Sequence, residues 1–333
     1  FLMIVMPPFL FTRRNTKLLL EEFSTQFPIK NLEYIAIPGV DLCRLHLYFE
    51  SAKKTFSFEE ESFERTLGER LKSMEDKLND FIEDNLSSKD ANYIKKHYVP
   101  FIPYHYQVRT HPKDLLDDLI AIDQLNSKKN VAFRCMPFNF PAFSDLAGRA
   151  SLLKIYSLQK MDLIHIIPVL ENLGLYVIDQ LTARIGTKTQ TKGFVQSFRI
   201  QGKAGKKIED PQTKRYIEAL LDEVYGNRFE NDPLNALVLA GLSHQQIALF
   251  LMYRNYFLQC DPAFSAQHIN YALCQYPKCT KILLDYFETR FNPRLKLSQE
   301  KRQESLDHYE ADFNKALQAV SFIQHDFSFR QFL

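Results

Sequence analysis

LLKIYSLQKMDLIHIIPVLENLGLYVIDQLTARI, residues 152–185, decides the fold, because its apolar period changes from two to about 3.6 and back again. LLKIYSL at its start alternates and puts Leu153 and Ile155 on one face. Lys154 and Tyr156 then lie on the other face, which is the pattern of a half-buried strand. The stretch therefore opens with a predicted strand.

A helix is predicted directly after this strand. Asp162 stands where a side chain can cap the first turn, and Gly174 supplies a left-handed stop at the other end. Pro168 lacks a backbone N–H, so the helix either bends there or begins close to it. The apolar positions share one helical face: Leu163, Ile166, Ile167, Leu170 and Leu173.

Two more strands and a helix complete the unit. Residues 175–185 and 193–200 alternate as strands, and residues 216–224 have helical spacing. The order strand, helix, strand, strand, helix is most of a ferredoxin-like module, in which helices cover one face of an antiparallel sheet. The same order is predicted for residues 1–86, where residues 57–86 form its long closing helix.

The remainder of the chain is predicted to be mainly helical. Residues 129–150 look extended, and prolines within them restrict any strand there to a sheet edge. We therefore predict an α+β protein with two ferredoxin-like (ACT-type) modules and a C-terminal helical bundle. Its domains would be a first module at 1–86, a linker at 87–150, a second module at 151–227 and the bundle at 228–333. Residues that begin or end the helices of the bundle are recognisable: Asp232 with Pro233, Gly241, Ser243 with Gln246, Ser265, Pro277, Asn292 with Pro293, and Ser298, which starts a final helix over 298–324.

Composition narrows the classes of function. The 333 residues are 45% hydrophobic and 25% charged, as expected for a folded domain with a sizeable core. A net charge of +2 gives no reason to expect nucleic acid or an anionic membrane as partner. Five scattered cysteines suit a reducing cytoplasm, and the apolar start FLMIVMPPFLF is too short for a membrane anchor. Because the chain starts without Met, we expect it to be a piece of a longer protein.

Several segments resemble a known family, the large NAD-specific glutamate dehydrogenases. IIPVLENLGLYVIDQ and VQSFRI are similar to the ACT-type regulatory segment that precedes the catalytic core of these enzymes. GNRFENDPLNALVLAGLSHQQIALFLMYRNYFLQ and FSAQHINYALCQYPKCTKILLDYFETRFNP are similar to their helical segment. The chain departs from the family at Gln180, usually an acidic residue, and at His244–Gln245, usually an aromatic residue followed by a basic one.

The resemblance implies a non-catalytic regulatory and oligomerisation portion of a glutamate dehydrogenase. The parent enzyme would convert L-glutamate, water and NAD to 2-oxoglutarate, ammonium and NADH. NAD would bind only in the parent, and this portion would carry no cofactor and no metal. Its partners would be the catalytic domain of the same polypeptide and further copies in a homo-oligomer. The alternative is a stand-alone amino-acid-binding regulatory protein of ACT type.

Few residues suggest a binding site, and none suggests catalysis. ACT folds often hold an amino-acid effector at a glycine-bearing turn after the first strand, but PPFLFT and SLQKMD contain no glycine, which favours an architectural role. GKAGKK lacks the spacing of a phosphate-binding loop. Asp179 interrupts an apolar strand face and needs a partner, either Arg184 or Arg199. The candidate effector or interface residues are Asp179, Arg184, Arg199 and Asp162.

Overall fold

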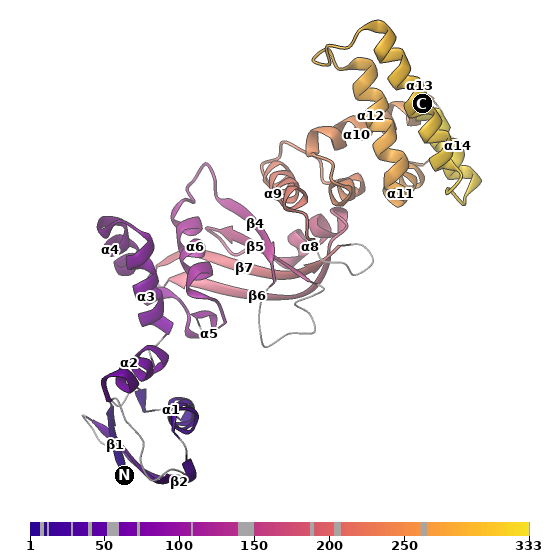
Figure 1. Ribbon diagram of the computed structural model, residues 1–333. Helices are drawn as coiled ribbons and strands as arrows, with labels where there is room; N and C mark the ends of the chain where they lie inside the picture. The colour runs from indigo at the N-terminus through magenta and orange to yellow at the C-terminus, as the bar shows by residue number, and fades with distance from the viewer. Residues whose placement is uncertain are drawn as a thin grey trace. The chain divides into compact units, whose positions relative to one another are not determined.

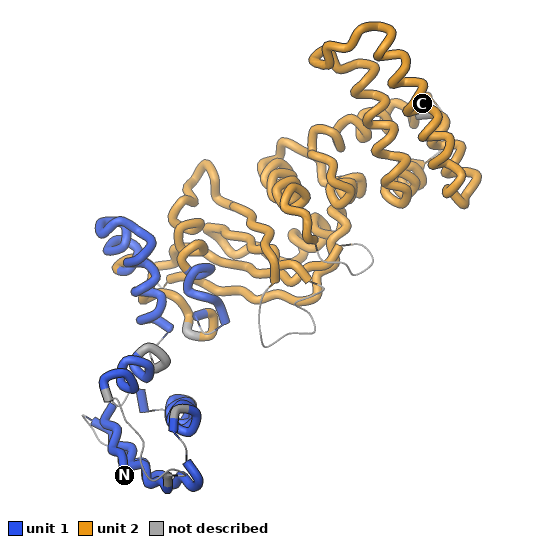
Figure 2. Tube along the Cα trace, viewed as in Figure 1, with its two compact units in different colours: residues 1–95, 107–115 blue, residues 96–106, 116–333 orange. Residues whose placement is uncertain are grey.

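The computed structural model (Figure 1) describes residues 1–6, 10–11, 13–27, 29–38, 42–51, 60–71, 74–107, 109–138, 150–186, 190–202, 208–260 and 265–332. Its backbone divides into two compact units, which Figure 2 distinguishes by colour. The smaller unit is residues 1–95 with 107–115, and the larger unit is residues 96–106 with 116–333. The division into four domains stays a prediction.

The smaller unit contains the first predicted module. Its elements are β1 (Leu2–Met6), α1 (Arg13–Gln26), β2 (Ile29–Ile37), β3 (Cys43–Ser51), α2 (Glu60–Leu71) and α3 (Met74–Asn85). β3 lies between β1 and β2 and is antiparallel to both, so the two outer strands are parallel and α1 connects them. The predicted order of elements is confirmed. The helix predicted over 57–86 is described as two helices, and residues 57–59 and 72–73 lie outside the described residues.

Four short helices follow α3 and lead to the second sheet. They are α4 (Ser88–His97), η2 (Val99–Phe101), α5 (Tyr104–Gln107) and α6 (Pro112–Asp123). η2, most of α5 and the second half of α6 belong to the larger unit. This part of the chain therefore contributes to the packing around the second module.

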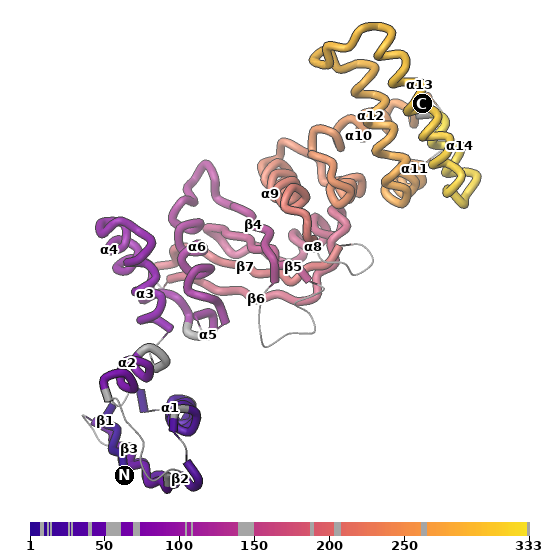
Figure 3. The backbone as a smooth tube through the Cα atoms, in the orientation of Figure 1, coloured from indigo at the N-terminus to yellow at the C-terminus, as the bar shows by residue number. Residues whose placement is uncertain are grey.

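The larger unit is built on a four-stranded antiparallel sheet. Its strands are β4 (Val131–Pro137), β5 (Ser151–Ser157), β6 (Tyr176–Gly186) and β7 (Thr191–Gln201), in the order β4-β5-β7-β6. α8 (Leu163–Asn172) connects β5 to β6, and α9 (Pro211–Tyr225) follows β7, as Figure 3 traces. The predicted module is confirmed, and β4 forms the additional edge strand predicted within residues 129–150. Residues 139–149 of that stretch lie outside the described residues.

β5 is covered on both faces, which corrects the prediction of a half-buried strand. Leu153 of β5 and Phe198 of β7 are directly paired and are buried in the core that α8 and α9 share. On the opposite face Lys154 and Tyr156 are also buried, with 2% and 1% of their surface exposed. They are covered because Asp118 of α6 reaches them from that side. Periodicity could not predict this second layer, since a polar residue normally faces water.

Of the two signals predicted to begin and end α8, the glycine at its C-terminus acts as expected and the aspartate at its N-terminus does not. Gly174 has φ +72°, and Leu175 N–H donates to Leu170 O at 2.9 Å, so the predicted left-handed stop is confirmed. Asp162 occupies the N-cap position, but its side chain makes no capping hydrogen bond. The helix continues through the exposed Pro168.

The rest of the larger unit is helical. It comprises η5 (Pro233–Ala240), α10 (His244–Cys260), α11 (Ala266–Gln275), α12 (Pro277–Phe291), α13 (Gln299–Leu317) and α14 (Ile323–Phe332). Ser243 and Gln246 form the predicted reciprocal capping box, and Ser265 and Ser298 cap α11 and α13. The long final helix predicted over 298–324 is wrong at its end, because α13 stops at Leu317 and α14 follows as a separate helix.

One hydrophobic core runs through the sheet and the helical region. It includes Leu153 and Phe198 from the sheet, Leu220 from α9, and Phe313 and Phe329 from the last two helices. None of the helices within the described ranges is long and apolar enough to cross a membrane. The four-stranded sheet and the C-terminal helices of the larger unit therefore share their packing.

Candidate functional site

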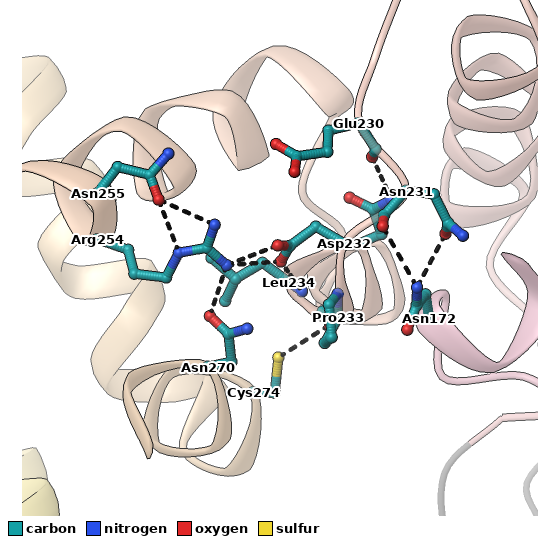
Figure 4. Close-up of polar contacts among 11 residues, drawn as sticks. Asn172, Glu230, Asn231, Asp232, Pro233, Leu234, Arg254, Asn255, Asn270 and Cys274 are labelled. Carbon is teal, nitrogen blue, oxygen red and sulfur yellow. Dashed lines mark hydrogen bonds and ion pairs between the residues drawn. The ribbon is translucent and has the colours of Figure 1, made fainter. Parts of the chain in front are cut away.

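The most heavily bonded polar group of the helical region is the guanidinium of Arg254 (Figure 4). Its Nη1 donates to both carboxylate oxygens of Asp232, at 2.8 and 2.7 Å, and to Oδ1 of Asn270 at 3.0 Å. Its Nε and Nη2 donate to Oδ1 of Asn255 at 3.1 and 3.0 Å. Arg254 is only 5% exposed, so its charge depends on these partners for compensation.

Local sequence signals bring the partners of Arg254 into place. Asp232 is the N-cap of η5, and its Oδ1 accepts from the N–H of Leu234 at 2.8 Å. Pro233 fits the first position of that helix because it needs no hydrogen bond there. Asn270 lies on the buried face of α11. The Arg254 network, defined here as Asp232, Arg254, Asn255 and Asn270, thus ties three helical elements together.

A pocket of about 740 Å³ opens beside this network. α8 and the start of β6 form one side of it, and η5, α10 and α11 form the other. Its lining includes two exposed tyrosines and three residues of the Arg254 network. The polar and aromatic side chains of its lining include Glu171, Tyr176, Asp232, Arg254, Asn270 and Tyr271. The pocket lies where the sheet module meets the helical region, so substitutions here should affect how the two parts pack.

A second buried polar cluster lies on the sheet face that α6 covers. Lys154 Nζ donates to both carboxylate oxygens of Asp118 at 2.8 Å. The hydroxyls of Tyr156 and Tyr106 donate to the same carboxylate at 2.8 and 2.7 Å. All four residues are at most 2% exposed. The Asp118 cluster, defined as these four residues, therefore fastens α5 and α6 to β5.

Burial shifts the pKa values of several groups near the sheet. It raises the pKa of the Asp118 carboxyl, against the opposing effects of Lys154 and the two tyrosine hydroxyls. It also raises the pKa of Tyr156 well above its ordinary value, and Asp118 adds to that shift. On the neighbouring strand β4, where Cys135 pairs with Leu153, burial raises the pKa of the Cys135 thiol to about 12, so Cys135 stays a protonated, packed side chain.

The residues predicted from sequence are brought together only in part. Asp179 forms an ion pair with Arg199, one of its two predicted partners, next to a register irregularity between Val177 and Asp179. Arg184 lies on the opposite face of β6. The register with β7 is unbroken from Asp179 to Arg184, side chains alternate along a strand, and an odd number of steps separates the two residues. Asp162 is exposed at the start of α8. Their role in binding an effector or forming an interface stays a prediction.

Sequence reasoning missed the Asp118 cluster and the Arg254 network. Lys154 interrupts an apolar run, and Arg254 stands inside IALFLMYRNYF, so each was a cation in an apolar segment. Such a residue signals a buried partner but does not identify it, since the partner lies far away in sequence. In the part of the chain that is described, no three His, Cys, Asp or Glu side chains are placed to hold a metal ion.

Two regions of the chain, one containing most of the four-stranded sheet and one containing the Arg254 network, match models of known protein domains. Residues 142–213 match the model of the glutamate dehydrogenase ACT3 domain, and residues 229–293 match that of glutamate dehydrogenase helical motif 3. The first match contains Lys154 and the Asp179–Arg199 pair, and the second contains the Arg254 network.

Three curated proteins that are similar to this chain are NAD-specific glutamate dehydrogenases of bacteria. That of Pseudomonas aeruginosa is 24% identical over 266 residues, which is 79% of this chain and 16% of the relative. That of Halomonas elongata is 21% identical over 282 residues, 84% of this chain and 17% of the relative. That of Mycobacterium tuberculosis is 24% identical over 204 residues, 59% of this chain and 12% of the relative. The chain thus spans less than a fifth of the length of each of these relatives.

Proposed function

Because the chain is homologous to the large NAD-specific glutamate dehydrogenases in their ACT3 and helical motif 3 regions, we propose that it is a non-catalytic regulatory and oligomerisation segment of such an enzyme. The parent enzyme oxidises L-glutamate with NAD and water to 2-oxoglutarate, ammonium and NADH. NAD binds in the catalytic domain of the same polypeptide. This segment holds that domain in its assembly and makes contacts between copies.

The continuous core of the larger unit is the observation that carries this proposal. Phe198 of the sheet and Phe313 of α13 belong to one buried cluster, and the Arg254 network bonds η5 to α10 and α11. Close-packed interiors resist deformation, so a displacement of the sheet is transmitted to the helices rather than absorbed between them. A module joined in this way suits a scaffold that positions a separate reaction centre.

The cytoplasm is the compartment that we propose for this protein. All five cysteines are free, and Cys43, Cys135 and Cys279 are buried. Buried thiols without disulfide partners are typical of proteins in reducing compartments. Oxidised glutathione is therefore expected to leave these three side chains unmodified in the folded protein.

A turnover assay tests the proposed function. The purified chain, supplied with L-glutamate and NAD, is expected to produce no NADH above the buffer blank, because the proposal places the reaction in another domain. Absorbance at the NADH band measures the product, and a commercial glutamate dehydrogenase in the same buffer serves as the positive control. Glutamate-dependent NADH formation that rises in proportion to the concentration of the chain would refute the non-catalytic role.

A further inference from the structure

A second pocket of the larger unit, about 530 Å³ in volume, has a different chemical character from the one beside Arg254. The connector at η2 and the start of α5 forms one wall, and the end of β6 forms another. Lys160, from the loop between β5 and α8, completes the lining. Its volume lies within the range of small-molecule sites, roughly 300–1,000 Å³.

The ionisable side chains that line this pocket are all bases. They are His105 from α5, Lys160 from the loop and Arg184 from β6, and no lining residue is acidic. Thr182 adds a hydroxyl whose oxygen accepts from Gln180 at 2.8 Å, so its own proton remains available to a ligand. Phe101 and Ile102 add apolar side chains to the lining.

The basic side chains of this pocket differ from the buried lysine and arginines of the unit: His105 and Lys160 are exposed, Arg184 is half-buried, and the pocket lining contains no carboxylate. Lys154, Arg199 and Arg254 each bond to an aspartate. Within the described residues, by contrast, the side chains of His105, Lys160 and Arg184 form no hydrogen bond or ion pair. Arg184 is half-buried, so its uncompensated charge is in a setting where an anion gains more than it would at an open surface.

We propose that this pocket binds a small dianion, either a dicarboxylate or a phosphate monoester. A planar guanidinium favours the paired oxygens of a carboxylate or phosphate, and a lysine beside it can hold a second negative group. A zwitterionic amino acid fits less well, because its ammonium group would face basic side chains and no carboxylate in the lining. The ligand class follows from the charges of the pocket and is independent of the proposed function.

Calorimetry on the whole chain tests the proposal with glutarate and orthophosphate as probes. We expect one of the two to bind saturably, and which one binds distinguishes a dicarboxylate ligand from a phosphate ligand. Glutamate is expected to bind more weakly than glutarate, since it adds the unfavourable ammonium group. Raising the NaCl concentration should weaken binding, as expected for a partly exposed charged site.

Variants locate the binding site. Arg184→Gln and Lys160→Gln should each weaken binding about tenfold or more, a loss that corresponds to about 1.4 kcal/mol. Lys296→Gln removes an exposed lysine outside the lining and should leave the affinity unchanged. Circular dichroism melts of each variant verify that the fold is retained.

Three results would overturn the anion site. They are the absence of saturable binding of either probe at millimolar concentration, equal affinities in Arg184→Gln and wild type, and tighter binding of glutamate than of glutarate. None of them would alter the outcome of the turnover assay, so failure of this site and failure of the non-catalytic role can be told apart.

Discussion

Replacing Asp118 by alanine is expected to lower the free energy of unfolding by about 3–5 kcal/mol. The carboxylate accepts two hydrogen bonds from Lys154 and one from each of two tyrosines, all inside the protein. Its removal leaves the ammonium of Lys154, which is 2% exposed, without a counter-charge. Urea unfolding followed by far-ultraviolet circular dichroism measures the change.

The neighbouring Asp117 provides a matched control for this prediction. Its carboxylate pairs with Arg134 at 2.9 Å, but the two side chains are 27% and 42% exposed. Surface pairs of this kind contribute about 0–1 kcal/mol, so Asp117→Ala should be almost neutral. If Asp118→Ala and Asp117→Ala were equally stable, the Asp118 cluster would not hold α6 on the sheet.

Replacing Arg254 by alanine is expected to have a similar effect, about 3–5 kcal/mol, in the helical region. Asp232 would then retain only its N-cap bond to Leu234 while remaining almost fully buried, at 8% exposure. Asn255 and Asn270 would lose the donor that both of them accept from. Hydrogen exchange should consequently become faster in η5 and α11, which mass spectrometry of peptides from these helices can measure.

Two further substitutions separate the geometry of this site from its charge. Arg254→Lys keeps the charge but lacks the planar fork that bonds Asp232, Asn255 and Asn270 together, so it should recover only part of the loss. Arg294→Ala removes an exposed arginine from the same unit and should change stability by about 0.5 kcal/mol or less. Full recovery by lysine would show that the hydrogen-bond geometry is unimportant.

Local signals in the sequence predicted most of the fold because they act over a few residues. Gly174 can adopt the left-handed conformation that ends α8, and Ser243 reaches the first turn of α10. The alternation of apolar residues placed Leu153 on the face of the sheet that α8 and α9 cover. These effects depend on neighbouring residues alone, so tertiary contacts did not override them.

Long-range pairing accounts for what could not be predicted. The partner of Lys154 lies 36 residues earlier, and that of Arg254 lies 22 residues earlier. A strand with an alternating polar face reads as half-exposed unless the covering helix is known. The Asp179–Arg199 pair was predictable because the two residues lie on adjacent strands, and that adjacency followed from the order of the elements.

If the chain has the role proposed above, a ligand in the anion pocket would act on a reaction centre that lies in another domain. A ligand in the pocket at Arg184 would contact the end of β6 and the connector, and β6 belongs to the same unit as the Arg254 network. A ligand there would affect the helices only if the unit had two arrangements of sheet and helices and the ligand bound one of them more tightly than the other. The largest shift that the ligand could cause between those arrangements would be set by the difference in its binding free energy for the two.

Titration of the purified chain with NADH, followed by the nicotinamide fluorescence, tests the non-catalytic role most directly. Because we place the cofactor in another domain, the emission should rise only in proportion to the added NADH, with no shift or saturation. Saturable enhancement, reversed by excess NAD, would mean that these 333 residues contain a dinucleotide site, and the proposed role would be wrong.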